Sequence, residues 1–185
     1  MKPGICPQSE ITYPKDDMYP ALVKFIGRIK QPVADVGELN VKSQYLAKYY
    51  NCPITQIAPV DLDYWISGNQ KFETIFCFEV VSHLVNPGWF MSELRTQLTP
   101  GGVIFLSMPA RPRFMMNKHH FHEFGPEHFQ KWILDELGLR IVKTARIRHT
   151  RMKEKWYKYI GFRPIIRFIF RIFYNFTIIY EIRND

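Results

Sequence analysis

Cysteine is scarce in this 185-residue sequence, which contains only Cys6, Cys52 and Cys77. The number is odd, no two cysteines have the CxxC spacing of a structural zinc site, and Cys77 falls inside an apolar run. The sequence therefore predicts neither a disulfide framework nor a cysteine-type zinc site. It indicates a reducing cytoplasm instead.

Long apolar runs are also absent, since none reaches the roughly 20 residues that cross a bilayer. Residues 1–17 lack the apolar core of a signal peptide. Because they are rich in proline and polar groups, we expect them to form a flexible arm. There is no repeat and no low-complexity segment, so the sequence predicts one domain over residues 1–185 with no membrane span.

Positive charge is in excess, with 25 lysine and arginine residues against 17 aspartate and glutamate residues and a net charge of +8. This leaves open an acidic partner, such as nucleic acid, anionic lipid or a phosphorylated substrate, or simply a basic soluble protein. The run Arg146–Lys158 is the basic segment that nucleic acid would need. Residues 163–174, rich in phenylalanine and arginine, fit a core helix, a peripheral membrane contact or a homodimer contact.

The stretch Lys71–Pro109 organises the rest of the chain. It opens with Thr74–Phe78, an apolar run that is too short for a helix. The run is also too uniformly apolar for a strand with one solvent-exposed face, so it predicts a strand buried on both faces. Apolar residues recur at helical spacing over Phe90–Leu98, Thr99–Gly102 stops that helix, and Val103–Met108 forms a second buried strand. Such a strand–helix–strand unit predicts a parallel sheet with helices on its faces.

The flanking elements follow from similar patterns. The predicted helices are Tyr19–Ile29, Val41–Tyr50 and one that begins at Pro126 and ends at Gly138. The predicted strands are Pro32–Gly37, Pro53–Ala58, Leu139–Ile147 and Phe176–Arg183. We expect the second helix to face the sheet with Leu46, Tyr49 and Tyr50, and the third with Phe129, Trp132, Ile133 and Leu137. The region after Ala58 has little room for a further helix.

Two segments, FETIFCFEVVSHLVNP and LTPGGVIFLSMP, occur in the order and at the distance found in class I S-adenosylmethionine-dependent methyltransferases. The chain from about Pro32 onwards resembles that family. The resemblance implies a three-layer, Rossmann-like α/β fold. Its sheet would be mostly parallel with an antiparallel last strand and helices on both faces. It also implies S-adenosylmethionine as cofactor and a methyl transfer to a small-molecule or glycan acceptor.

In the resembled family, an acid and spaced glycines follow the first strand, because glycine lets the backbone approach the cofactor closely. Asp35 and Gly37 match that pattern, whereas Leu39 and Val41 replace the later glycines. Asn40 tolerates a positive φ better than most residues, so it could keep the turn open. Glu38 would either pair with the cofactor amino group or sulfonium, or face water or an arginine.

Four more residues are predicted cofactor contacts by their positions after other strands. Asp61 and Asp63 follow the second strand, where a carboxylate would accept from the ribose hydroxyls or the adenine amino group. Turn capping by either acid is the alternative. Phe78 and Glu79 end the central strand, where the family lines the methyl-transfer face.

Catalysis would need a base that removes a proton from the acceptor, because methyl transfer is a direct displacement at an activated carbon. His83, His119 and His122 are the candidates, since imidazole titrates near neutrality. His83 fits a capping or packing role equally well. The cluster around His119 and His122 also fits metal binding or loop packing, although its spacing is not diagnostic of a metal site.

We therefore predict an S-adenosylmethionine-dependent methyltransferase. The alternative is a protein of the same fold that has lost transfer chemistry and acts as a binding or scaffolding module. The altered glycine loop and the short region after Ala58 favour that alternative, while the retained Asp35, Gly37 and Glu79 favour the enzyme. A nucleic-acid-binding module ranks third.

Overall fold

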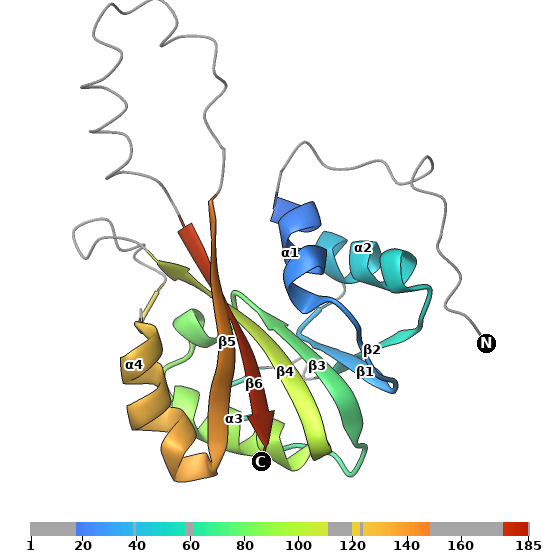
Figure 1. The fold of residues 1–185 in the computed structure, drawn as a ribbon. Helices are drawn as coiled ribbons and strands as arrows, with labels where there is room; N and C mark the ends of the chain where they lie inside the picture. The colour runs from blue at the N-terminus through green and yellow to red at the C-terminus, as the bar shows by residue number, and fades with distance from the viewer. Residues whose placement is uncertain are drawn as a thin grey trace, which may run out of the picture.

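A six-stranded sheet in the order β2-β1-β3-β4-β6-β5 forms the centre of the molecule (Figure 1). The computed structural model describes residues 18–38, 40–57, 61–110, 120–122, 124–148 and 176–184. Four neighbouring strands are parallel: β1 (Val33–Val36), β2 (Ile54–Ile57), β3 (Phe72–Phe78) and β4 (Leu98–Ala110). β6 (Phe176–Asn184) is antiparallel to both β4 and β5 (Leu139–Arg148). The predicted mostly parallel sheet with an antiparallel last strand is confirmed.

Helices cover both faces of this sheet, as predicted. α1 (Met18–Ile26) and α2 (Val41–Tyr50) pack on one face, and α3 (Pro87–Thr96) and α4 (Pro126–Phe129) pack on the other (Figure 1). The short helices are η2 (Val81–His83), η4 (Gln130–Leu134) and η5 (Asp135–Leu137). The three layers follow from strands that are apolar on both sides.

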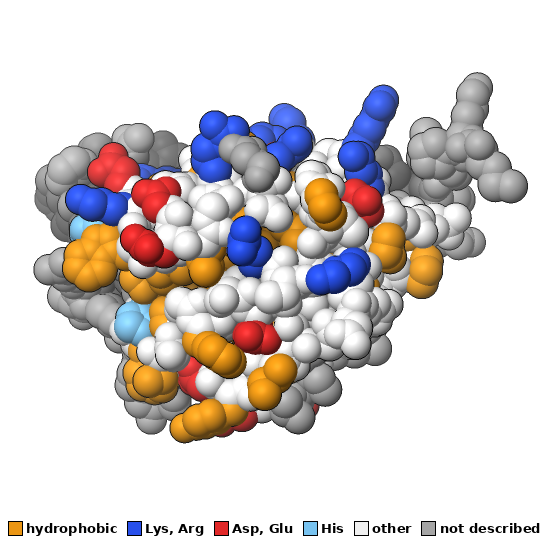
Figure 2. Space-filling view, turned by 90° about the horizontal axis from the view of Figure 1, so that it is seen from below, with side chains coloured by type: hydrophobic (Ala, Val, Ile, Leu, Met, Phe, Trp, Pro, Cys, Tyr) orange, Lys and Arg blue, Asp and Glu red, His pale blue; other side chains and the backbone are white. Residues whose placement is uncertain are grey.

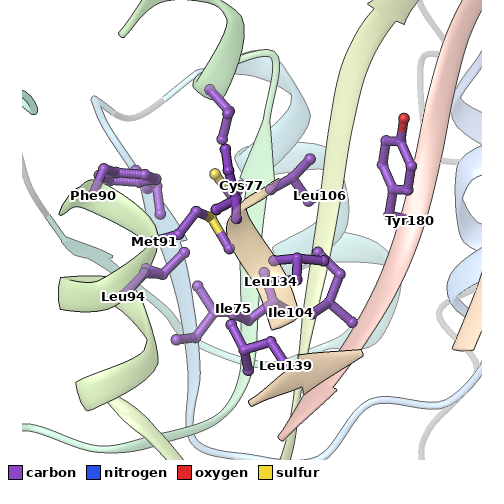
Figure 3. Packing of buried hydrophobic residues seen from close by; sticks show 14 of the residues in the cluster. Ile75, Cys77, Phe90, Met91, Leu94, Ile104, Leu106, Leu134, Leu139 and Tyr180 are labelled. Atoms are coloured by element: carbon purple, nitrogen blue, oxygen red, sulfur yellow. The ribbon is translucent and has the colours of Figure 1, made fainter. Parts of the chain in front are cut away.

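Alternation along the strands divides the core into two clusters. On β3, Phe76 faces α1 and α2, whereas Ile75 and Cys77 face α3 and α4. Figure 3 shows Ile75 and Cys77 beside Met91 and Leu94 of α3, all fully buried. Burying one such side chain contributes roughly 1.5–3 kcal/mol, so both helices are held by packing rather than by helix propensity.

Local signals set the helix boundaries. Asn86 precedes α3 and accepts a hydrogen bond from the Trp89 N–H (3.1 Å), and Pro87 occupies the first helical position. Gly138 ends η5 at φ 62°, the left-handed conformation that favours glycine. On the face of the sheet that α1 covers, Lys143 of β5 donates to the Phe25 carbonyl oxygen of α1 (2.7 Å). The Lys143 Nζ lies 4.4 Å from the Phe25 ring centroid.

Leu98 does not belong to the helix before it, contrary to the prediction. α3 ends at Thr96, and Leu98 begins β4, where it pairs with Phe72. The Phe72 N–H donates to the Gln97 carbonyl oxygen (2.8 Å), which ties the end of α3 to the start of β3. The strand therefore begins before the glycine turn, and the turn is an irregularity within β4.

Trp132 was predicted to face the core, but 72% of it is exposed. Gln130–Leu134 forms a π-helical turn, and this wider turn changes which residues share a face. Phe129 and Leu134, five residues apart, are both fully buried. The prediction assumed regular α-helical spacing, which placed Trp132 on the wrong side.

Tyr49 is also misplaced by the prediction, since it is 37% exposed rather than turned to the sheet. Leu46 is fully buried, and Tyr50 is partly buried against the core, as expected. Tyr45, which was not predicted, is buried against Tyr19 of α1 with ring centroids 4.8 Å apart. The neighbouring helix α1 therefore determines which tyrosines of α2 are covered.

Several sequence-based expectations lie outside the described residues: the arm 1–17, His119, the segment 163–174 and most of the Arg146–Lys158 run. Within the described part, Cys52 and Cys77 are free and buried. No helix among those residues is both long and apolar enough to cross a membrane.

Candidate functional site

The carboxyl ends of β1, β2, β3 and β4 meet at one edge of the sheet, which is where open parallel sheets bind ligands. The predicted site residues follow these ends. Gly37 comes after β1, Asp61 and Asp63 follow β2, and Glu79 follows β3. The sheet order places β1 between β2 and β3, so the three loops are neighbours.

Gly37 has a backbone conformation and surroundings that are consistent with the predicted cofactor contact. Its φ is +97°, and a Cβ built on it would meet no heavy atom of the other described residues within 4 Å, its chain neighbours apart. Its N–H donates to the Ile57 carbonyl oxygen (2.8 Å), which fixes the loop against the end of β2. Glu38 is exposed beside it, and Leu39 is outside the described residues. A glycine is required here by conformation, and the space beside it is open to a ligand.

Asn40 does not adopt the positive φ considered for it, because its φ is −129°. Its side-chain oxygen accepts from the backbone N–H of Lys42 (2.9 Å) and Ser43 (3.2 Å), and its side-chain nitrogen donates to the Glu38 carbonyl oxygen (3.1 Å). Asn40 is therefore the N-cap of α2. By this bonding it holds the loop in place. A contact with cofactor remains a prediction.

Asp35 lies in β1 and is 3% exposed. Its carboxylate accepts a hydrogen bond from the Ser43 hydroxyl of α2. Burial raises the pKa of the Asp35 carboxyl to about 6, although the Ser43 hydroxyl and the Lys42 charge oppose that shift. The carboxylate therefore connects β1 to α2 beneath the loop between them. Asp35 would affect ligand binding only indirectly, by holding the loop Gly37–Asn40 in position.

The two acids after β2 have backbone partners. Asp61 accepts from the Asp63 N–H (3.1 Å), which is the turn-capping role weighed for it. Asp63 accepts from the N–H groups of Val85 (3.0 Å) and Asn86 (2.8 Å) through its two oxygens. Asp63 thus joins the loop after β2 to the start of α3. Ribose contact by either acid remains a prediction.

Phe78 and Glu79 end β3 next to β4. Phe78 is half-buried and stacks on Phe76, with centroids 5.5 Å apart. Glu79 has φ +60°, a left-handed conformation that is unusual for a residue with a side chain. Its carboxylate accepts from the Ser107 hydroxyl of β4 (2.9 Å). Backbone strain of this kind concentrates at functional sites, so Glu79 stands out on the edge.

The segment 120–122, which contains His120 and His122, packs on η2. The N–H groups of Phe121 and His122 both lie within hydrogen-bonding reach of the Ser82 carbonyl oxygen (2.8 and 3.3 Å). The His122 ring nitrogen is 3.3 Å from the Val85 carbonyl oxygen. His83 is exposed, and its ring meets that of His120 edge-on, with centroids 4.6 Å apart. The segments that contain His83 and His122 therefore lie side by side, and His120 contacts the ring of His83.

Metal binding by this cluster finds no support in the described residues, where no group of three or more histidine, cysteine, aspartate or glutamate side chains could hold an ion. Large apolar side chains are exposed on the loops after β2 and β3, in the segment 120–122 and in the first turn of α3. These are Tyr64, Ile66, Val85, Trp89 and Phe121. Figure 2 views the molecule from the opposite end of the sheet, where apolar side chains lie next to two histidines along one flank.

Sequence reasoning missed two residues of this site. Ser107 was assigned only to a core strand, and His120 was passed over in favour of its neighbours. A hydroxyl within a uniformly apolar strand was the available signal for Ser107. His120 had no such signal, because adjacent histidines in a loop give no indication of which one packs inward.

Comparison with known proteins agrees with the arrangement. Residues 29–156 match the family described as a methyltransferase domain. A ubiquinone biosynthesis O-methyltransferase of Parvibaculum lavamentivorans is 22% identical over 149 residues, covering 66% of this chain and 55% of that enzyme. The chain thus spans about half the length of this curated relative.

Solved structures agree in fold. Coclaurine N-methyltransferase, bound to N-methylheliamine and SAH, has a TM-score of 0.62 and 12% identity, covering 90% of this chain and 71% of that one. A SAM-dependent methyltransferase from Archaeoglobus fulgidus has a TM-score of 0.56 and 17% identity, covering 89% and 92%. Identities this low show a common fold alone.

Proposed function

This chain belongs to the methyltransferase domain family, and on that premise we propose that it is an S-adenosylmethionine-dependent methyltransferase. The transfer is to a small-molecule or carbohydrate-like acceptor. The cofactor, when bound, supplies the activated methyl group. The protein's part is to position the acceptor in line and to take up its proton.

The opening at Gly37 is the observation that carries the proposal. A positive φ, open space beside the Cβ position and a backbone bond to β2 together form a cradle at the edge where three strands end. The residues around it suit the cofactor: carboxylates at Glu38 and Glu79 complement its positive groups, and Phe78 offers a half-buried ring.

The proposed role of the histidines is to take up the acceptor proton. His83 is exposed at the end of η2, four residues after Glu79 in the sequence. His122 is held against the Val85 carbonyl oxygen on the same segment. We assign the base to one of these two, and the apolar side chains on the surrounding loops favour an acceptor with an apolar part.

Titration calorimetry with S-adenosylmethionine and its demethylated product tests the proposal. We expect micromolar binding of both by the wild type. Gly37→Trp places a large side chain in the cradle and should abolish binding. Gly27→Trp is the matched control, because Gly27 also has a positive φ (+69°) and open space but follows α1, away from the edge. Both substitutions force a residue with a Cβ into a positive φ, which is less favourable at Gly37 because +97° lies outside the left-handed region that includes +69°.

Only loss of binding in the Gly37 variant, with binding kept in the Gly27 variant, agrees with a cofactor cradle. No heat and no thermal shift with either ligand in the wild type would refute the proposed function. Binding without transfer to any of a panel of sugars and small phenols would favour the non-catalytic module instead.

A further inference from the structure

We infer that Ser107 is a positioning residue that holds Glu79 ready for the cofactor. The inference rests on the proposed function and adds a residue to the same site. Ser107 lies in β4 and pairs with Phe78, the last residue of β3. It would touch neither cofactor nor acceptor, and would act only through Glu79.

Ser107 forms hydrogen bonds with both the backbone and the side chain of Glu79. The Glu79 N–H lies 3.0 Å from the Ser107 carbonyl oxygen and 3.1 Å from the Ser107 hydroxyl oxygen. The hydroxyl donates its single hydrogen to Oε1 of Glu79 (2.9 Å). The carboxylate is therefore folded back towards β4, and this hydrogen bond leaves Oε2 for another group.

These hydrogen bonds explain the left-handed backbone conformation of Glu79. A left-handed conformation is unfavourable for a residue with a Cβ, and surrounding contacts must hold it. The hydrogen bonds between Ser107 and the N–H and carboxylate of Glu79 are such contacts. In an extended Glu79 these two groups would point in different directions, and Ser107 could not bond to both. The chain turns sharply at this point into η2, which begins at Val81.

The position of Ser107 makes this role specific. Ser107 is 3% exposed, and its neighbours Leu106 and Met108 are fully buried apolar residues. A buried hydroxyl without a partner is unfavourable, and the partner of this hydroxyl among the described residues is Glu79. A serine that served packing alone would be replaced without loss by alanine.

The functional consequence is preorganisation of a carboxylate at the carboxyl end of the central strand. A glutamate free to rotate would lose side-chain freedom on binding, whereas one already fixed does not. Ser107 thereby raises the affinity for a cationic cofactor. The effect should be larger for the sulfonium-bearing cofactor than for its uncharged-sulfur product if Glu79 faces the positive sulfur.

A double-mutant cycle tests the inference by calorimetry. We expect Ser107→Ala to weaken S-adenosylmethionine binding about tenfold, and Ser107→Thr, which keeps the hydroxyl, to stay within threefold. Glu79→Ala should weaken binding at least as much as Ser107→Ala. Adding Ser107→Ala to Glu79→Ala should then change nothing, because Ser107 acts through Glu79.

Thr74→Ala is the matched control for stability. Thr74 is a buried hydroxyl at the other end of β3, where it donates to the Lys30 carbonyl oxygen (2.8 Å) and accepts from the Lys30 N–H (3.2 Å). Its loss should lower the melting temperature about as much as Ser107→Ala does, while leaving the cofactor dissociation constant unchanged.

Unchanged affinity in Ser107→Ala, or additive losses in the double variant, would overturn the inference while the proposed function stands. Absence of cofactor binding by the wild type would overturn both. Equal losses of affinity in Ser107→Ala and Thr74→Ala would also overturn the inference, because they would show a general effect of stability.

Discussion

Asp35 shows how a residue of a binding motif can serve the scaffold. Its carboxyl is buried, and the Ser43 hydroxyl and the Asn40 cap both hold the start of α2 near it. The first acid of the predicted cofactor loop thus stabilises the loop from underneath. Such a carboxylate is costly to bury, and its cost depends on pH.

Stability should fall as Asp35 ionises. Its folded pKa, about 6, is above the ordinary value of 3.8, so the folded state holds the proton more tightly. The group therefore costs nothing below about pH 4. Its penalty grows as pH rises and is complete above about pH 6, at about 3 kcal/mol. Asp35→Asn should consequently be more stable than wild type at pH 7.5, with the difference shrinking towards pH 4.5.

Urea unfolding of both proteins across that pH range measures the difference, and carboxylates common to both cancel. Ser43→Ala removes the hydrogen bond that lowers this pKa, so it should raise the folded pKa further and enlarge the total loss of stability between low and high pH. A difference between Asp35→Asn and wild type that stays constant with pH would contradict the assignment.

The residue scale is where sequence reasoning was weakest. The positions of Gly37 and Glu79 could be predicted because strand ends and glycine conformations leave local patterns. The partners of Asp63 and Glu79 could not, because Val85 and Ser107 lie 22 and 28 residues away along the chain. Long-range hydrogen bonds of this kind decide whether a polar side chain faces a ligand or a neighbouring loop.

At the scale of elements, β4 is the most irregular strand. Between the pairs Phe72–Leu98 and Thr74–Val103 the register shifts, so β4 accommodates extra residues through the glycine turn. Gly101 takes φ +73°, and a Cβ on Gly102 would lie 2.9 Å from the Thr99 carbonyl oxygen and from the Leu98 side chain. Here glycine is required by space as well as by conformation.

Gly102→Ala should therefore destabilise the protein by roughly 1–3 kcal/mol, because the backbone oxygen of Thr99 cannot move away cheaply. Thermal unfolding measures the effect. Gly88→Ala is the matched control with the opposite sign. Gly88 lies in α3, and a Cβ there would meet only Asn86 Oδ1 at 3.8 Å. Alanine favours a helix by roughly 0.5–1 kcal/mol over glycine. Equal melting temperatures for the two variants would disprove the steric argument.

Elements were predicted well where periodicity was regular. Helix Val41–Tyr50 has the predicted bounds, and the strand positions agree within a few residues. The failures at Leu98 and Trp132 have a common cause. In both places the backbone departs from ideal geometry, through an irregular strand start and a π turn, and local sequence patterns assume ideal geometry.

At the scale of the whole molecule, the two core clusters share the same strands. Cys52 belongs to the cluster under α1 and α2, and Cys77 to the cluster under α3 and α4. Burial raises the pKa of both thiols, so neither should react readily in the native state. These two cysteines report separately on the two faces of the sheet.

We expect both thiols to become reactive at the same urea concentration, because neither face can open without disrupting strands that the other needs. Pulsed labelling with a thiol reagent, followed by peptide mass spectrometry, measures the two midpoints in a Cys6→Ser background. Far-UV circular dichroism should give the same midpoint. Labelling of Cys52 well before Cys77 would mean instead that the α1–α2 face unfolds as a separate unit.

The direction of β6 has a practical consequence for handling the protein. Because β6 is antiparallel to β4, its last residues pair with the start of β4 and of β5, with Arg183 opposite Val103 and Asn184 opposite Leu139. That end of the sheet is opposite the edge where Gly37 and Glu79 lie (Figure 1). An affinity tag or a surface linker fused after Asp185 would thus hold the molecule by its far end and leave the cofactor edge facing the solution.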